Sequence, residues 1–240
     1  MEKQRKEEVT AIIPSRKTIE ENYDFLGHVL ETGLFPTISP VSPNIIQNNT
    51  RSLTEVYQEA LETTEGDIIV FMHDDIEFLK PGWADTIYDI FKRNPQYGII
   101  GVAGSRIYGE KDKLAWWDCD AEFKRGFIFH GDENKSWPTI FSDFNDNVDL
   151  MEVAVVDGVF MAVNKKRIQC GFDTNIKGFH FYDIDFCISN FLSHKCRIGV
   201  TNKIAIRHKS TGVINEEWVK NGQYVIEKYK NNLPIKVFRK

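Results

Sequence analysis

Short apolar runs alternate with amphipathic segments over the first hundred residues. The runs are residues 9–13, 67–72 and 98–102, and their continuous apolar or β-branched character is typical of strands buried on both faces of a parallel sheet. Apolar positions at helical spacing predict helices in the intervening segments, at residues 18–32, 52–66 and 83–93. This order of strand and helix predicts an α/β fold with a doubly wound, mostly parallel sheet flanked by helices.

The helix that begins near residue 52 has the clearest start signal. Ser52 and Glu55 have the spacing of a capping box, in which each side chain accepts a hydrogen bond from the other residue's backbone N–H, and Gly66 ends the helix. Residues 35–49 precede it and hold three prolines. They predict a loop with a short strand around Ile45 and Ile46.

The pattern changes after residue 104. Residues 105–149 are rich in Trp and Phe without a clear period, which indicates irregular or antiparallel structure. Regular signals then return as two strands, a helix, a longer strand and a last helix, predicted at residues 152–156, 160–163, 183–193, 197–206 and 216–230. Because no linker is visible, we predict one domain over residues 1–240, with parts at about 8–104, 105–215 and 216–240.

Composition narrows the class of protein. The apolar fraction of 42% can supply a sizeable core, and a net charge of −5 without a long Lys or Arg run argues against nucleic acid as a partner. The four cysteines have no CxxC spacing, which favours a reducing compartment over a zinc ribbon or a disulfide scaffold. No apolar run approaches the roughly 20 residues of a transmembrane helix. We therefore expect a cytoplasmic protein, with a peripheral position at the inner membrane face as an alternative because the end of the chain is mildly basic and apolar.

Acidic side chains follow one of the predicted buried strands. The sequence His73-Asp74-Asp75-Ile76-Glu77 comes directly after residues 67–72. Ligands of open α/β sheets bind beyond the carboxyl ends of strands, and Mg²⁺ or Mn²⁺ prefers carboxylate oxygens. An acidic surface turn is an equally good interpretation of this segment alone.

A second acidic segment begins a predicted helix. Asp183 and Asp185 stand in the sequence YDID, where carboxylates can cap a helix or favour its positive end. One of them can also serve as a general base, and the two roles can be divided between the pair. His208 follows a predicted strand, so it too lies at the expected functional edge of the sheet.

Polar residues around the first predicted strand are candidates for binding a nucleotide and its phosphates. They are Pro14, Ser15 and Arg16 at the end of the strand, and Asn49 and Arg51 before the capped helix. Hydrogen-bond donors and a guanidinium group suit phosphate oxygens. Taken singly, these are ordinary turn and cap residues.

The ordered set of motifs resembles the family 2-like glycosyltransferases of GT-A fold. The segments that carry the resemblance are IIPSR, NNTRSLTEVYQEAL, GDIIVFMHDDIEF, PGW, GIIGVAGSR, VDGVFMAVNK, GFDTNIKGFHFYDIDFCI and IRHKSTG, which span residues 9–212. The resemblance implies a nucleotide-binding part at about 8–104, an acceptor and catalytic part at about 105–215 and a smaller antiparallel portion on the acceptor side.

The resemblance also implies a divalent metal, Mn²⁺ or Mg²⁺, at the segment HDD. Asp75 matches the second acidic position of the DxD motif, and His73 stands where the first aspartate is usual. Either Asp74 or Glu77 could then complete the metal site. We place Asp75, His208 and His73 in the expected metal group and Asp74 on the donor side.

The acidic segment YDID resembles the motif that holds the family's base. Asp183 falls at the position of that base, Tyr182 replaces the usual glutamate, and Asp185 at the following acidic position is a structural candidate. We expect the acceptor side to include Asp157, Gly158, Trp117, His180 and Tyr182, with the aromatic rings of residues 105–149 packing on sugar or filling the core.

The resulting hypothesis is metal-dependent transfer of a sugar from a nucleotide-diphosphate donor to the hydroxyl of a glycan, lipid-linked or protein acceptor. One base and one displacement imply inversion, and surface polysaccharide or glycan assembly is the expected setting. A nucleotidyltransferase is an alternative, although its glycine-rich phosphate loop is missing from IIPSRK. A catalytically inactive nucleotide-sugar-binding module is the other alternative, which His73 favours.

Overall fold

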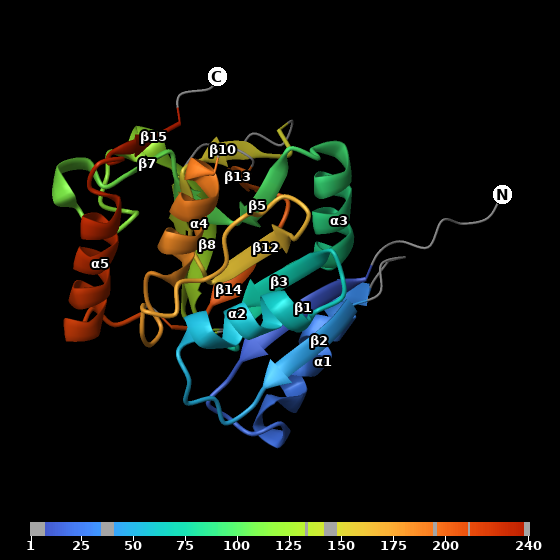
Figure 1. Cartoon of the computed structure of the whole chain (residues 1–240). Helices are drawn as coiled ribbons and strands as arrows, with labels where there is room; N and C mark the ends of the chain where they lie inside the picture. Colours follow the sequence, from blue (N-terminus) through green and yellow to red (C-terminus); the bar gives the residue numbers. More distant parts are fainter. Residues whose placement is uncertain are drawn as a thin grey trace.

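The computed structural model describes residues 8–34, 41–132, 134–141, 148–193, 196–210 and 212–237. Expectations for residues 1–7, 35–40, 142–147 and 238–240 lie outside the described residues. Two large sheets and five α-helices form the described part of the chain, and α5 stands beside α4 at one side of the molecule (Figure 1).

The larger sheet holds the buried strands that the apolar runs predict. Its order is β10-β13-β5-β12-β3-β1-β2. The strands are β1 (Val9–Pro14), β2 (Val41–Ile46), β3 (Ile68–Met72), β5 (Tyr97–Gly101), β10 (Met151–Val153), β12 (Phe160–Asn164) and β13 (Arg197–Val200). Strands β2, β1 and β3 are parallel, as are β5 and β13, whereas β12 is antiparallel to both of its neighbours. The α/β prediction is confirmed, with a mixed central sheet.

A second sheet brings distant segments together. Its order is β11-β6-β8-β14-β4, and β9 pairs with β8. The strands are β4 (Ile76–Phe78), β6 (Ala103–Ser105), β8 (Lys124–Gly131), β9 (Ser136–Ile140), β11 (Val155–Val156) and β14 (Ile206–His208). A short pair, β7 (Ile107–Tyr108) with β15 (Ile235–Lys236), joins the end of the chain to the middle. The aromatic segment therefore does contain antiparallel pairs, between β8 and β9 and between β6 and β8.

Five α-helices lie in the described part of the chain. They are α1 (Tyr23–Leu34), α2 (Leu53–Thr63), α3 (Trp83–Arg93), α4 (Tyr182–Leu192) and α5 (Glu216–Tyr229), with short 3₁₀ turns at Glu20–Asn22, Glu110–Asp112 and Ala121–Phe123. The capping box of Ser52 and Glu55 is present at α2. Figure 1 shows α2 and α4 in front of the larger sheet, and α1 packs against α3, where the indole N–H of Trp83 donates to the Val29 carbonyl oxygen.

Two predicted strands are each divided in the structure. Residues 197–206 form β13 and β14, which belong to different sheets, because Thr201 starts a turn in which its hydroxyl accepts the backbone N–H of Lys203. Residues 152–156 form β10 and β11, also in different sheets. The first predicted helix begins later than expected, with a 3₁₀ turn before α1. No helix among the described residues is long and apolar enough to cross a membrane.

Candidate active site

Three potential metal ligands meet where the two sheets approach each other. His73 and Asp75 follow β3, and β14 pairs antiparallel with β4 so that His208 lies opposite Ile76. The Nε2 atom of His208 is 3.2 Å from Oδ1 of Asp75 and 3.5 Å from Nδ1 of His73. One ligand atom from each of the three residues lies within 4.8 Å of the others. The structure therefore brings His208 beside two residues that precede it by more than a hundred positions in the chain.

The chemistry of these three side chains fits a divalent transition metal. Two imidazoles and one carboxylate supply nitrogen and oxygen ligands, and the group borders a cleft through which substrate oxygens could complete the coordination. Tyr182 supports the arrangement, since its hydroxyl is 3.0 Å from Nε2 of His73 and fixes the ring with Nδ1 toward the group.

The surroundings shift the pKa values of the two imidazoles in opposite directions. Burial and the nearby charge of His208 lower the pKa of His73, which favours the neutral ring that a metal needs. Burial acts to lower the pKa of His208 as well, but the hydrogen bond to Asp75 raises it overall. A metal ion at this group therefore competes with a proton for His208.

The alternative ligands that the sequence left open lie elsewhere. The carboxylate of Asp74 accepts a hydrogen bond from the hydroxyl of Ser15 at the end of β1. Glu77 lies on β4 and accepts a hydrogen bond of 2.5 Å from Arg207 on β14. The structure thus places His73 beside Asp75, and it gives Asp74 and Glu77 other partners.

Asp183 lies in the first turn of α4, at the wall of the same cleft. Its Oδ2 atom accepts the backbone N–H of Gly158 at 2.7 Å, and Oδ1 accepts the N–H of Ile184 at 2.9 Å. Burial and the charge of Asp157 raise its pKa from 3.8 to about 7. A carboxyl group with a pKa near neutrality can accept and release a proton under physiological conditions.

The backbone beside Asp183 is held in an uncommon conformation. Phe181 has φ of +67°, in the left-handed region that residues other than glycine rarely adopt. A Cβ atom at Gly158 would lie 2.2 Å from the hydroxyl oxygen of Tyr182, so only glycine fits there. The Tyr182 hydroxyl also donates to the Gly158 carbonyl at 2.9 Å. These contacts join the turn before β12 closely to the start of α4.

Asp157 is also held by specific contacts. Its Oδ2 atom accepts the indole N–H of Trp116 at 3.1 Å, and Oδ1 accepts the backbone N–H of Val159 at 2.9 Å. Trp116 is buried, whereas the neighbouring Trp117 is 41% exposed and lines the cleft. His180 lines the same cleft, and burial lowers its pKa.

The expected donor-side residues divide into two groups. Ser15 and Asn49 are buried beside the end of β1, and the Asn49 backbone N–H donates to the Ser15 carbonyl at 2.8 Å. The Arg16 guanidinium lies 4.2 Å from the centre of the Phe179 ring and borders both the large cleft and a smaller hollow of about 350 Å³. Pro14 ends β1 and does not line either space.

Arg51 does not line either space. It forms an ion pair of 2.5 Å with Glu59 on the exposed side of α2, with about half of each side chain open to solvent. Because this pair is exposed, we place Arg51 on the surface near the smaller hollow and not among its lining residues.

The large cleft has a volume of about 910 Å³ and collects most of the expected site residues. Its lining includes side chains that the sequence did not single out, among them Lys124, His130, Phe179, Glu217 and Trp218. Lys124, Ile128 and His130 stand at even-numbered positions of β8 and therefore lie on one face of the strand. A period of two in the aromatic segment could have identified this face from the sequence. Glu217 and Trp218 come from α5, whose position depends on tertiary packing.

Comparisons with known proteins agree with this geometry. A family described as glycosyltransferase-like matches residues 41–236. No curated protein sequence is similar enough to this chain to count as a match.

Among solved structures, a mannosyltransferase from Pyrobaculum calidifontis in complex with GDP-Man and Mn²⁺ is 11% identical with a TM-score of 0.53, over 95% of this chain and 64% of that one. GalNAc-T7 with UDP, GalNAc and Mn²⁺ is 8% identical with a TM-score of 0.53, over 93% of this chain and 48% of that one. This chain thus covers less than two thirds of either protein. Both similarities show the GT-A fold, and because the family match extends over most of the sequence, this chain belongs to the glycosyltransferase-like family.

Proposed function

We propose that this protein transfers a sugar from a nucleoside-diphosphate donor to an acceptor hydroxyl in glycan assembly, with inversion at the anomeric carbon. The observation that carries the proposal is that one cleft is lined by His73 and His208, which form the metal-ligand group with Asp75, and also by Asp183. Such a displacement needs a metal ion that neutralises charge on the departing diphosphate and a general base that is active near neutral pH.

The donor side of the proposal rests on Arg16 and the end of β1. Arg16 borders both the cleft and the smaller hollow, so its guanidinium group can bind diphosphate oxygens between them. Asn48, Asn49 and Phe179 line the hollow and offer hydrogen bonds and an aromatic face to a nucleoside. The bound UDP and GDP-Man named for the two structural neighbours support a nucleotide donor.

The metal-ligand group favours Mn²⁺ over Mg²⁺. Mg²⁺ prefers an all-oxygen octahedral shell, and two of the three ligands here are imidazoles. When bound, the ion would act as a Lewis acid that neutralises charge on the departing diphosphate. Mn²⁺ is also the ion named for both neighbours.

Asp183 is the proposed base. The acceptor oxygen forms a bond to the anomeric carbon, the bond from that carbon to the diphosphate oxygen breaks, and the proton of the acceptor hydroxyl passes to the carboxylate of Asp183. The hydrogen bond from the Gly158 N–H holds the carboxylate in place during this transfer. A single displacement with one base inverts the anomeric centre.

The test combines a panel of nucleotide sugars with Mn²⁺, Mg²⁺ or a chelator. We expect the wild-type protein to release nucleoside diphosphate from one donor in the presence of Mn²⁺. Asp75→Ala should abolish this metal-dependent release, and Asp183→Asn should bind donor and metal normally while the rate of transfer falls by about 10²–10⁴-fold.

The matched control is Asp24→Asn, which changes an exposed carboxylate of α1 outside the cleft. It should behave as the wild-type protein does. Failure of the wild-type protein to bind any nucleotide sugar with any metal would refute the proposal. Tight binding without turnover, unaffected by Asp183→Asn, would instead indicate a nucleotide-sugar-binding module.

A further inference from the structure

A row of aromatic rings borders the cleft beside Asp183. Successive rings are in contact, with centroid separations of 5.1 Å, 5.7 Å, 6.4 Å and 4.9 Å. In order, the rings belong to Phe141, Trp116, Trp117, Trp218 and Phe181, and all five residues line the cleft. We call this row the aromatic wall. It ends at Phe181, two residues before the proposed base.

The wall presents indole surface to the cleft. Trp117 is 41% exposed even though it contacts both Trp116 and Trp218. Tryptophan combines a large apolar face with a polar N–H, so an exposed indole in a cleft is suited to a ligand that has both apolar and polar parts. A pyranose ring has this character, because its C–H groups gather on one face while its hydroxyl groups point outward.

Two charged side chains of the same cleft make no hydrogen bond or ion pair in the part of the chain that the structure describes. Within the described residues, neither Glu217 nor Lys124 forms a side-chain hydrogen bond or an ion pair, although both line the cleft. A carboxylate can accept hydrogen bonds from sugar hydroxyl groups, and an ammonium group can donate to their oxygens. An alkyl chain in the same place would bury both charges without compensation, which is unfavourable.

Helix α5 fixes the position of Glu217 and Trp218. The Asn215 side chain caps the helix by accepting the Trp218 N–H at 2.9 Å, and Asn221 donates to the carbonyls of Lys177 at 2.7 Å and His180 at 3.3 Å. These bonds join the first turns of α5 to the loop before α4. These bonds therefore fix Trp218, the residue of the wall that comes from α5, at the end of the helix that borders the cleft.

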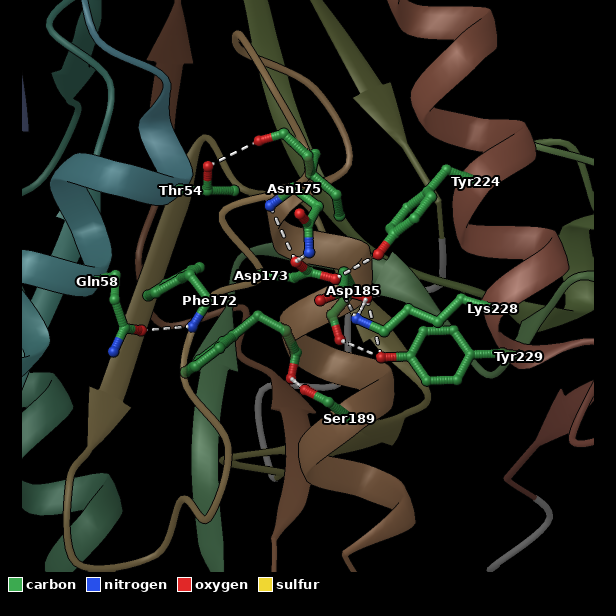
Figure 2. Close-up of polar contacts among 12 residues, drawn as sticks. Thr54, Gln58, Phe172, Asp173, Asn175, Asp185, Ser189, Tyr224, Lys228 and Tyr229 are labelled. Atoms are coloured by element: carbon green, nitrogen blue, oxygen red, sulfur yellow. Dashed lines mark hydrogen bonds and ion pairs between the residues drawn. The ribbon is translucent and has the colours of Figure 1, made fainter.

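An ionic network around the buried Asp185 holds the other end of the helix. The ammonium group of Lys228 lies between the carboxylates of Asp173 and Asp185, at 2.7 Å from each, as Figure 2 shows. The Tyr229 hydroxyl donates to Asp185 at 2.9 Å, and the Tyr224 hydroxyl donates to Asp173 at 2.8 Å (Figure 2). Asp185 thus anchors α5 to α4, while Asp183 in the same helix faces the cleft.

We propose that the aromatic wall is the binding subsite for a sugar ring of the acceptor, so the acceptor of this enzyme is a carbohydrate. The inference rests on the proposed transferase function. A pyranose ring stacks on Trp117 and Trp218, its hydroxyl groups bind Glu217 and Lys124, and one further hydroxyl group points to Asp183. A lipid or a peptide without sugar lacks a ring with several hydroxyl groups that could bind Glu217 and Lys124 while it stacks on the wall.

The first test compares acceptor kinetics for Trp117→Ala and Glu217→Gln with those of the wild-type protein. We expect the acceptor KM to rise about tenfold for Trp117→Ala, with a much smaller change in kcat, because stacking binds the acceptor without taking part in the bond changes. Trp117→Phe should recover part of the loss. The control is Trp137→Ala, since Trp137 is 44% exposed but does not line the cleft.

The second test needs no donor. Tryptophan fluorescence is titrated with methyl pyranosides and short oligosaccharides, and in parallel with detergent monomers and a hydroxyl-containing peptide. We expect saturable changes with one class of sugar, which are lost in Trp117→Ala and kept in Trp137→Ala. Equal sugar binding by the two variants, or transfer to a sugar-free lipid or peptide at the same rate in Trp117→Ala, would overturn the inference. Absence of metal-dependent donor turnover in the wild-type protein would count against the transferase proposal alone, because sugar binding is measured separately.

Discussion

Replacing Asp183 by asparagine should stabilise the protein while it removes the proposed base. The carboxyl group is half-buried at the start of α4, where burial and the charge of Asp157 raise its pKa from 3.8 to about 7. Because the folded-state pKa lies above the unfolded value, ionisation of this group opposes folding. The destabilisation is absent below about pH 4, grows as the pH rises toward 7, and is complete above that pH.

The magnitude follows from the two pKa values. At about 1.4 kcal/mol per pH unit, a pKa raised from 3.8 to about 7 lowers the stability by at most about 4 kcal/mol at pH 8, and by about 1.7 kcal/mol at pH 5. Partial exposure of the carboxyl reduces both figures. Asparagine also loses one of the two hydrogen bonds from the Gly158 and Ile184 N–H groups, worth about 1 kcal/mol, but that loss is the same at both pH values.

The assay is urea unfolding of metal-free wild type, Asp183→Asn and Asp24→Asn at pH 5 and pH 8. The stability of Asp183→Asn relative to wild type should increase by about 2 kcal/mol between the two pH values. Asp24→Asn corrects for any general effect of removing a carboxylate. If the stability difference for Asp183→Asn is the same at both pH values, the raised pKa is refuted, and with it the basis for a base poised near neutrality.

Three other predictions follow from the same geometry. The kcat for sugar transfer should increase with pH and level off above about pH 7, since Asp183 acts only when deprotonated; a flat profile from pH 5.5 to 8.5 would contradict this. His73→Ala should raise the Kd for Mn²⁺ at least tenfold, as measured by isothermal titration calorimetry. Glu77→Gln should leave this Kd unchanged, because Glu77 pairs with Arg207. Lys228→Met should lower the free energy of unfolding by about 2–3 kcal/mol, because it leaves Asp185 buried without its cation; an unchanged urea midpoint would argue against the ionic network.

The central part of the fold was predictable because its strands are continuous apolar runs. Residues 68–72 are all buried in β3, and the capped segment after Ser52 forms α2. The division of residues 197–206 was not predictable from hydrophobicity, since apolar residues continue on both sides of the break. There the chain turns, and the Thr201 hydroxyl accepts the backbone N–H of Lys203.

The proximity of His73, Asp75 and His208 was predictable because these residues stand at the ends of strands. His73 and Asp75 follow β3 and His208 ends β14, so the sheet topology brings them together. Trp218 and Glu217 were not predictable as site residues, because nothing local shows that α5 packs beside α4. That position depends on long-range contacts, such as those of Lys228.

The histidine at position 73 has an electrostatic consequence for the whole site. The ligand set of His73, Asp75 and His208 carries one formal negative charge when both imidazoles are neutral, because Asp74 is tied to Ser15 instead. A divalent ion held by this set keeps a net charge of about +1, whereas two carboxylate ligands would leave it neutral. An imidazole in place of a carboxylate therefore leaves more positive charge to bind a diphosphate. Metal binding at this group also depends on pH, because the hydrogen bond to Asp75 raises the pKa of His208 and a metal ion competes with that proton.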